Sequence, residues 1–479
     1  MFARPPSAAE LDRHLDALQG LVDAAGLLTD PADMPRYERD WMGKFHGRAL
    51  GVIRPRDTAA VARVLAYLNA HRLPVVPQAG NTGLVGGSVP DAAGAFVLSV
   101  ERMTRIRAVD AVGASITLDA GVVLESAQEA ARRAGLMLAL DLGSKGSCRI
   151  GGNISTNAGG LKVLRYGHIR EQVLGLEVVL ADGTVLDGLS SLRKNNTGYD
   201  LKQMFIGAEG TLGVVTAATL KLFPAEAGRA VAMVAVDRFD DALAVLAAVR
   251  RGFPGRLNSV ELIGADAVAL VAGTLPGARS PFALAHTYAV LIEVGSDDAD
   301  AVAERGRLEE AIGALIEAGR VADAAIAQSD AQAEGLWRLR EGVPEAVAHT
   351  APVHKYDLTF AVGDIGRFIA DCDLALARVA KGLRPVYFGH VADGNVHVNV
   401  MAPPGMQASG YQALQGPIDD AIFDLVAQYR GSISAEHGIG QVKRAYLDRN
   451  RSTAEIATMR ALKAMLDPNG VLNPHRLLP

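Results

Sequence analysis

The chain has 479 residues, more than a single hydrophobic core usually organises, so two or more cores are expected. Its hydrophobic fraction of 49% and charged fraction of 21% are typical of a packed protein and exclude a disordered chain. Because the net charge is -5 and the Lys and Arg residues are scattered, nucleic acid is disfavoured as the main partner.

The first half of the chain combines helices with short strands. Ser7 and Glu10 form a capping-box pattern that predicts a helix over residues 7–28. Asp57 or Thr58 then caps a helix between two strands, which predicts a βαβ unit. Further strands are expected at 95–100 and 115–120, a helix at 123–134, a hairpin with its turn at 181–183, and a β-rich segment at 211–223.

The second half repeats strands and helices after Pro224, which is the best boundary. Strands are predicted at 231–236, 257–262 and 287–294, and helices at 240–250, 264–271 and 300–318. This alternation favours an α+β domain whose helices cover one sheet. The expected domains are an N-terminal helical segment at 1–45, a first domain at 46–224 and a second domain at 225–479.

Several classes of site and location are excluded or disfavoured by the composition. No uninterrupted apolar run approaches the ~18–20 residues of a membrane helix, and the N-terminus lacks the apolar core of a secretory signal. A soluble, cytoplasmic protein is therefore expected. Cys148 and Cys372 lie far apart and outside any C-x-x-C pattern, so they supply neither a disulfide framework nor a thiolate metal site.

Three glycine-rich segments, at 74–88, 146–167 and 207–216, are candidates for contact with a cofactor. The first follows an apolar strand, and glycine allows successive backbone N–H groups to approach an anion closely. A plain loop is the alternative for each segment alone. The first segment matches neither a Walker loop nor the G-x-G-x-x-G dinucleotide pattern.

The segment GHVADGNVHVNV at 389–400 carries two histidines on either side of a turn signal. If Asp393 and Gly394 form a two-residue turn, His390 lies opposite His397, with Cβ atoms roughly 5 Å apart. That spacing suits two imidazoles binding one metal ion, and Asn399 shares their face. The alternative is a pair of hydrogen-bonded surface histidines.

The segment SISAEHGIG at 432–440 offers a carboxylate and a further histidine. Two histidines and Glu436 form a recurring metal-binding set with open coordination positions. If the backbone is extended, His437 points away from Glu436 and is available as a base beside the metal.

The three glycine-rich loops resemble the FAD-binding fold of the vanillyl-alcohol oxidase and p-cresol methylhydroxylase superfamily. The segments at 389–400, 432–440 and 466–474 resemble the C-terminal half of the D-2-hydroxyglutarate and D-lactate dehydrogenases of that superfamily. The resemblance extends from about residue 36 to the end of the chain. It implies an α+β protein with a two-part FAD-binding domain, an α+β substrate domain with an antiparallel sheet, and a C-terminal helical segment.

The resemblance implies noncovalent FAD, because no Gly-Gly-His tether is present and Cys148 has no partner motif. The FAD contacts that it implies are Pro77, Gln78, Ala79, Gly80, Asn81, Thr82, Gly83, Leu84, Gly87, Ser88, Leu142, Gly143, Gly146, Ser147, Ile150, Gly151, Gly152, Ser155, Thr156, Asn157, Gly159, Tyr166, Gly167, Glu209, Gly210, Gly213, Val214, Val215 and Asn473.

It also implies a divalent metal, of zinc type, at His390, His397 and Glu436, with His437 as the base that also contacts substrate. Asn399, Arg340 and Lys355 match positions that bind substrate. Solvated surface charge is the alternative for the two cations, but a dicarboxylate needs cations at both ends. Pro344 stands where some relatives carry a hydroxyl residue that contacts substrate, which weakens the substrate assignment.

The expected activity is FAD-dependent oxidation of a D-2-hydroxy acid to the 2-oxo acid, with D-2-hydroxyglutarate favoured over D-lactate or D-malate. Electrons would pass from the flavin to an electron-transfer flavoprotein or a quinone. An oxidase that uses O₂ and a nonenzymatic flavin- or metal-binding protein are the alternatives. A homodimer is a further expectation.

Overall fold

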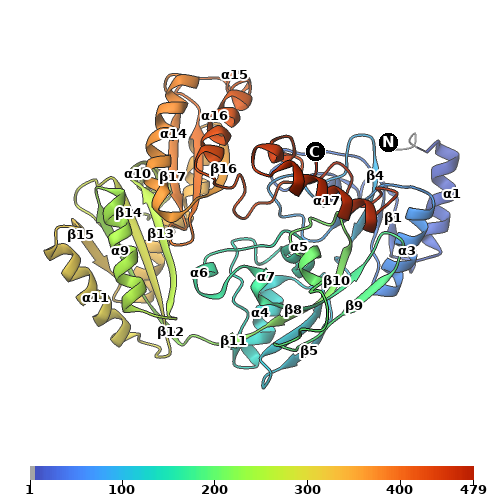
Figure 1. Ribbon diagram of the computed structural model, residues 1–479, viewed down its shortest axis with the longest axis horizontal. Helices are drawn as coiled ribbons and strands as arrows, with labels where there is room; N and C mark the ends of the chain where they lie inside the picture. The colour runs from blue at the N-terminus through green and yellow to red at the C-terminus, as the bar shows by residue number, and fades with distance from the viewer. Residues whose placement is uncertain (1–5) are drawn as a thin grey trace. The chain divides into compact units, whose positions relative to one another are not determined.

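The computed structural model describes residues 6–479 and divides the chain into two compact units (Figure 1). Unit 1 contains residues 6–160, 166–225 and 436–479, and unit 2 contains residues 161–165 and 226–435. These units differ from the expected domain ranges because residues 436–479 pack with the first part of the chain and residues 161–165 pack with the second. The expected segment 1–45 begins outside the described residues.

Two sheets form most of unit 1. The first has the order β1-β2-β4-β3, with β2, β4 and β3 parallel and β1 antiparallel to β2. The second has the order β5-β6-β10-β8-β9 and is antiparallel throughout. The strands are β1 Leu27–Leu28, β2 Ala49–Ile53, β3 Val75–Gln78, β4 Ala95–Ser99, β5 Ile106–Asp110, β6 Ser115–Asp119, β7 Leu136–Met137, β8 Val173–Val179, β9 Val185–Gly188, β10 Val214–Lys221 and β11 Phe223–Pro224.

Helices of unit 1 begin at the expected caps. The capping box of Ser7 and Glu10 is present, and the Asp57 side chain accepts from the Ala60 N–H. The first helix ends at Gln19 rather than at residue 28, because the chain turns at Gly20 and Leu27 pairs with β2. The helices are α1 Ala8–Gln19, α2 Pro35–Glu38, α3 Thr58–Ala70, α4 Leu124–Arg133, α5 Ile150–Ser155, α7 Ile169–Gln172, α8 Lys202–Phe205, the 3₁₀ helix η2 Arg444–Arg449 and α17 Thr453–Leu466; α6 Val163–Tyr166 lies at the unit boundary.

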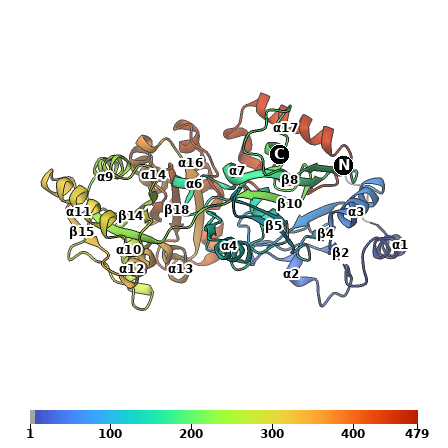
Figure 2. The same cartoon turned by 90° about the horizontal axis from the view of Figure 1, so that it is seen from below.

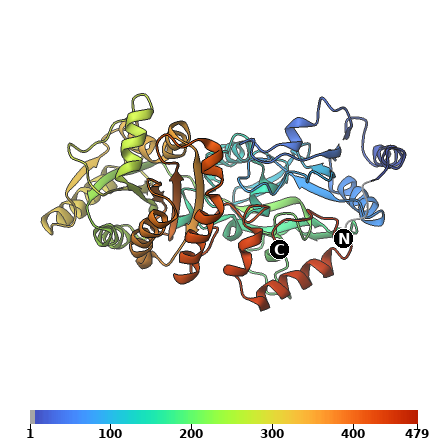
Figure 3. The same ribbon diagram turned by 90° about the horizontal axis from the view of Figure 1, so that it is seen from above.

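The C-terminal segment returns to the start of unit 1. Leu472 is fully buried and bridges Val75 in parallel, and the Asn473 N–H donates to the Val75 carbonyl at 2.8 Å. In Figures 1 and 3 the red helix α17 accordingly lies with the blue and green strands of this unit. Residues near 472 therefore belong to the same hydrophobic core as Val75.

Unit 2 is built on one antiparallel seven-stranded sheet with the order β15-β12-β14-β13-β17-β18-β16. Its strands are β12 Gly228–Val236, β13 Leu257–Gly264, β14 Tyr288–Ser296, β15 Asp323–Ile326, β16 Val353–Thr359, β17 Arg384–Gly389 and β18 Asn395–Met401. Its helices are α9 Phe239–Gly252, α10 Ala265–Thr274, α11 Val302–Glu317, α12 Asp330–Glu341, α13 Val343–Thr350, the 3₁₀ helix η1 Val362–Asp364, α14 Ile365–Val379, α15 Ala408–Gln412 and α16 Gln415–Gln428.

Helices cover both faces of this sheet. Figure 2 shows α9, α14 and α16 on one side and α10, α12 and α13 on the other. On the second side, Ile263, Leu291, Trp337, Val343 and Phe388 belong to one buried apolar cluster. The α+β class with an antiparallel sheet in the second part of the chain is confirmed. Among residues 6–479, none of the helices combines the length and apolar character that a bilayer crossing requires.

Candidate active site

A cavity of about 380 Å³ lies in unit 1, where the glycine-rich loops after β3, before α5 and before β10 converge. Twenty-two of the residues expected to contact FAD line it. They are Pro77, Gln78, Ala79, Gly80, Asn81, Thr82, Gly83, Leu84, Gly87, Ser88, Leu142, Gly143, Gly151, Gly152, Ser155, Thr156, Gly159, Glu209, Gly210, Gly213, Val214 and Val215.

The other expected contacts lie outside this lining. They are Gly146, Ser147, Ile150, Asn157, Tyr166, Gly167 and Asn473. Ile150 is fully buried in the core of unit 1, and the Tyr166 ring packs at 4.7 Å from Phe223. Lining residues that the sequence reasoning missed are Val85, Val100, Ser144, Arg149, Asn153 and Ala158. Val85, Arg149, Asn153 and Ala158 lie within the glycine-rich segments, so these segments themselves indicated them, whereas Val100 and Ser144 lie outside.

Two kinds of glycine shape the cavity. A Cβ at Gly83 or Gly143 would meet no atom within 4 Å, so a side chain there would enter open space. A Cβ at Gly80 would lie 2.6 Å from the Ser147 carbonyl oxygen, so two of the loops touch at that point. The cradle accordingly leaves backbone exposed toward the cavity, which fits a large cofactor with a diphosphate.

Glu209 joins the cavity wall to the C-terminal segment. Its two carboxylate oxygens accept from the N–H groups of Ile439 and Gly440 at 2.7 and 2.8 Å. The Asn473 amide donates to the carbonyls of Glu209 and Gly87 at 2.6 and 2.9 Å. Burial raises the pKa of Glu209, against the lowering effect of these donors. Through its two hydrogen bonds, Asn473 links the first and third glycine-rich loops without lining the cavity itself.

Glu436 and His437 line the same cavity. The Gly160 N–H donates to Glu436 Oε1 at 2.8 Å, which fixes this carboxylate against the second glycine-rich loop. The backbone bends from Ala435 to His437 and Gly438 has a φ of +83°. The extended backbone on which opposite orientations of the two side chains depended is therefore absent from this segment.

In unit 2, the two histidines of the predicted hairpin lie close together, but not by the predicted register. Phe388, not His390, lies opposite His397. The prediction of a two-residue turn was wrong because the loop spans residues 390–394, closed by a hydrogen bond from the Asn395 N–H to the His390 carbonyl. The imidazole centroids of His390 and His397 are nevertheless 5.7 Å apart.

Each of these imidazoles faces a buried carboxylate. His390 Nδ1 lies 2.7 Å from Glu261 Oε1, and His397 Nδ1 lies 3.5 Å from Asp357 Oδ1. Burial alone would raise the pKa of Glu261, but the facing His390 and Arg340 hold the pKa well below its usual range. A histidine whose Nδ1 faces a carboxylate keeps Nε2 for a metal ion, which is the usual arrangement around bound zinc.

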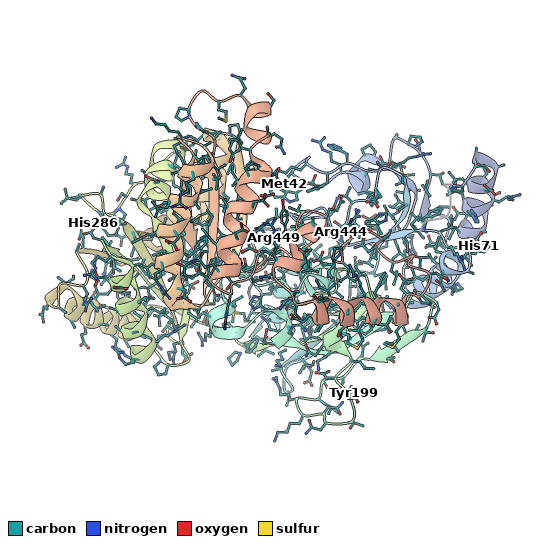
Figure 4. All side chains as sticks on the ribbon, turned by 45° about the horizontal axis from the view of Figure 1, so that its top comes forward. Met42, His71, Tyr199, His286, Arg444 and Arg449 are labelled. Atoms are coloured by element: carbon teal, nitrogen blue, oxygen red, sulfur yellow. The ribbon has the colours of Figure 1, made fainter. Side chains whose placement is uncertain are left out.

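Two other histidines, His71 and His286, make ordinary surface contacts. The ring of His71 packs at 4.2 Å from Tyr67, and His286 Nδ1 lies 3.2 Å from the exposed Asp237; both histidines are labelled in Figure 4. The carboxylates that face His390 and His397 are instead fully buried.

Arg340 is held on the buried face of α12. Trp337, one helical turn earlier, donates its indole N–H to Glu293 at 2.8 Å, and Arg340 Nε donates to Glu261 at 2.7 Å. The guanidinium lies 4.8 Å from the centroid of the Phe388 ring. Within residues 6–479, no hydrogen-bond partner is found for its two Nη groups, which are the donors that grip a carboxylate.

Lys355 and Asn399 are direct partners across β16 and β18. Asn399 is 3% exposed, and its buried Nδ2 has no hydrogen-bond partner in the part of the chain that the structure describes. Leaving such a donor unsatisfied costs about 1–3 kcal/mol, so a ligand that accepts from it would be favoured. Lys355 is exposed beside it.

Glu261 was missed by the sequence reasoning. The only signal was an acidic residue inside the apolar strand LNSVELIG, where an ionised carboxylate needs partners to be tolerated.

Two family models match the chain, one to each part. The FAD binding domain matches residues 49–188, and the C-terminal domain of the FAD linked oxidases matches residues 226–477. The D-2-hydroxyglutarate dehydrogenase of Xanthomonas citri pv. viticola is 40% identical over 466 residues, covering 97% of both chains. The chain belongs to this family of FAD-linked dehydrogenases. The expected resemblance is thereby confirmed, as is an FAD-dependent enzyme.

Other relatives of this FAD-linked dehydrogenase carry related names. The mitochondrial D-2-hydroxyglutarate dehydrogenase of Arabidopsis thaliana is 37% identical over 100% of this chain and 84% of its own. A putative D-lactate dehydrogenase of Schizosaccharomyces pombe is 35% identical over 95% of this chain and 87% of its own. Among solved structures, p-cresol methylhydroxylase has a TM-score of 0.74 at 16% identity, covering 99% of this chain and 98% of that one, which shows a shared fold.

The expectation of a cytoplasmic protein is wrong in the light of these relatives. Those from Arabidopsis thaliana, Danio rerio and Bos taurus are named mitochondrial. That expectation depended on the first residues of the sequence, and these do not identify a compartment.

Proposed function

We propose that this FAD-linked dehydrogenase oxidises D-2-hydroxyglutarate to 2-oxoglutarate. The observation that carries the proposal is Arg340, whose Nε is bound by Glu261 while its two Nη donors have no partner among the described residues. A buried guanidinium in this state suits the carboxylate of a ligand. Lys355 supplies a second cation in the same unit, and the names of the relatives support the same substrate.

FAD is proposed to bind noncovalently in the cavity of unit 1. No histidine takes the position of a Gly-Gly-His tether in the first loop, and burial raises the pKa of Cys148, which disfavours the reactive thiolate. Acid precipitation should therefore release a yellow supernatant. Flavin that stays with the protein pellet would show a covalent link.

A divalent ion, of zinc type, is proposed on His390, His397 and Glu436. The paired imidazoles with carboxylates at Nδ1 support the first two ligands. Glu436 directly follows Ala435, whose N–H donates to the carbonyl of Asp357, the strand partner of His397. Fully active protein in which elemental analysis finds no divalent metal would end this part of the proposal.

When bound, FAD supplies the acceptor for the hydride lost from C2 and the divalent ion supplies a Lewis acid at the hydroxyl. The protein's own groups do the remaining work. His437 takes the hydroxyl proton, the Asn399 amide donates to the substrate, and Arg340 and Lys355 hold its carboxylates. As the final acceptor of the electrons removed from the substrate we propose an electron-transfer flavoprotein or a quinone.

The direct test is reduction of the bound flavin without oxygen. D-2-Hydroxyglutarate added under nitrogen should bleach the flavin absorbance, and the 2-oxo acid should form in a 1:1 ratio with reduced flavin. The L-enantiomer is the matched control and should leave the absorbance unchanged. Flavin that stays oxidised with every D-2-hydroxy acid would contradict the proposal, and rapid oxygen consumption in air would identify an oxidase.

D-Lactate is the second candidate substrate, favoured by the putative D-lactate dehydrogenase among the relatives. Pro344 lies in the first turn of α13. It has no hydroxyl, so it cannot make the substrate contact that the family resemblance implies for some 2-hydroxyglutarate dehydrogenases at this position. Bleaching rates with D-lactate and D-malate in the same assay separate these candidates.

A further inference from the structure

We propose that Glu261 is a positioning residue that binds His390 and Arg340 at once, and so holds a metal ligand and a substrate cation in a fixed relation. The inference rests on the proposed function. It concerns a residue that neither touches the substrate nor ligates the metal, but acts through two residues that do.

Each carboxylate oxygen of Glu261 contacts one of these two residues, and Oε1 also accepts from the Ser259 hydroxyl at 3.0 Å. Oε1 accepts from His390 Nδ1 and Oε2 accepts from Arg340 Nε, both at 2.7 Å. Glu261 is fully buried, and Arg340 and His390 are 5% and 7% exposed. Charge-assisted hydrogen bonds of this kind are about twice as strong as neutral ones and fix geometry as well.

The carboxylate also selects the form of His390. An ionised carboxylate only accepts hydrogen bonds, so His390 Nδ1 must carry the proton. In the neutral ring, Nε2 then keeps the lone pair that a metal ion requires. The other tautomer would carry a hydrogen on Nε2, the nitrogen that binds the metal in the proposed site. Glu261 therefore selects the tautomer of His390 that can bind a metal ion.

A second acid on the same sheet face provides a comparison. Glu293, on the neighbouring strand β14, is also buried and accepts from Trp337 of α12, from Arg229 and from Asn258. Both acids therefore anchor α12 to the sheet. Only Glu261 binds proposed site residues, so Glu293→Gln is the matched control for a loss of packing alone.

The test compares Glu261→Gln with Glu293→Gln in the FAD-loaded full-length protein. The NH₂ group introduced by Glu261→Gln would face either Arg340 Nε, which only donates, so that this hydrogen bond is lost, or His390 Nδ1, which accepts only in the tautomer that carries its proton on Nε2. Either arrangement disturbs one of the two residues that Glu261 holds. Glu261→Gln should lower the affinity for Zn²⁺, measured by competition with a chelator, by about 10- to 100-fold. It should also raise KM for D-2-hydroxyglutarate at saturating Zn²⁺. Glu293→Gln should leave both quantities within about twofold, although both variants lose thermal stability.

The outcomes separate this inference from the proposed function. If wild-type protein binds no Zn²⁺ and its flavin is not bleached, the proposed function fails. If wild-type protein does both and the two Gln variants behave alike, only the role of Glu261 is overturned. If Glu261→Gln does not fold, nitrogen–proton correlation spectra of metal-free wild-type protein test the inference instead. The His390 signal is identified by its loss in His390→Gln. This signal should show a proton on Nδ1. A proton on Nε2 would overturn the inference.

Discussion

Replacing His437 with alanine should slow flavin reduction by D-2-hydroxyglutarate by about 10²-fold or more, because a positioned general base contributes about that much. The variant should still bind FAD, since His437 is one of many residues around the cavity and no glycine of the cradle changes. Stopped-flow absorbance under nitrogen measures the rate.

The control for this variant is His71→Ala, which removes an exposed histidine of the same unit that lies at the end of α3. Its flavin should be reduced at the wild-type rate. Wild-type rates in His437→Ala would exclude the base assignment. Loss of Zn²⁺ from His437→Ala would instead reassign the residue as a metal ligand.

Arg340→Ala should lower kcat/KM for D-2-hydroxyglutarate by roughly 10²-fold, since a hydrogen bond to a charged group contributes about 1.5–3 kcal/mol. The loss for D-lactate should be smaller, because D-lactate lacks the second carboxylate. Lys355→Ala should likewise lower kcat/KM more for D-2-hydroxyglutarate than for D-lactate. The measurement is kcat/KM for both acids with an artificial electron acceptor.

Arg338→Ala is the matched control, since Arg338 is on the same helix but exposed. Arg338→Ala should leave kcat/KM for both acids unchanged. Arg340→Lys keeps the positive charge but loses the paired N–H donors of the guanidinium, so its kcat/KM for D-2-hydroxyglutarate should lie between those of Arg340→Ala and the wild type. Equal losses for the two substrates in Arg340→Ala would show that the cation serves the shared carboxylate or the packing of α12, and the preferred substrate would change.

Local signals in the sequence predicted local structure correctly. The capping box at Ser7, the N-cap at Asp57 and the turn at 181–183 depend on residues only a few positions apart, and all three are present. The β17–β18 register was wrong by two residues because the loop is closed by the backbone of His390 rather than by Asp393 and Gly394 alone. A turn dipeptide favours a hairpin but does not determine how many residues the loop contains.

The candidate site was predicted unevenly. Glycine-rich loops indicated the cavity because backbone exposure requires glycine at particular positions. Glu261 carried no comparable signal, because Arg340 and His390, the proposed site residues that it binds, lie 79 and 129 positions away along the chain. The return of residues 436–479 to unit 1 was missed for the same reason: Leu472 and Val75 become neighbours only through the tertiary fold.

This return gives the protein an unusual order of assembly during translation. Unit 1 is begun first and finished last, since residues 436–479 emerge only after the whole of residues 226–435. At about 5–20 residues per second, the ribosome needs roughly 13–50 s to make the part of the chain after residue 225. Until then Val75 lacks its bridge to Leu472 and Glu209 lacks the N–H groups of Ile439 and Gly440. Cofactor loading therefore follows the synthesis of residues 436–479, which supply two residues of the cavity lining and the donors that bind Glu209.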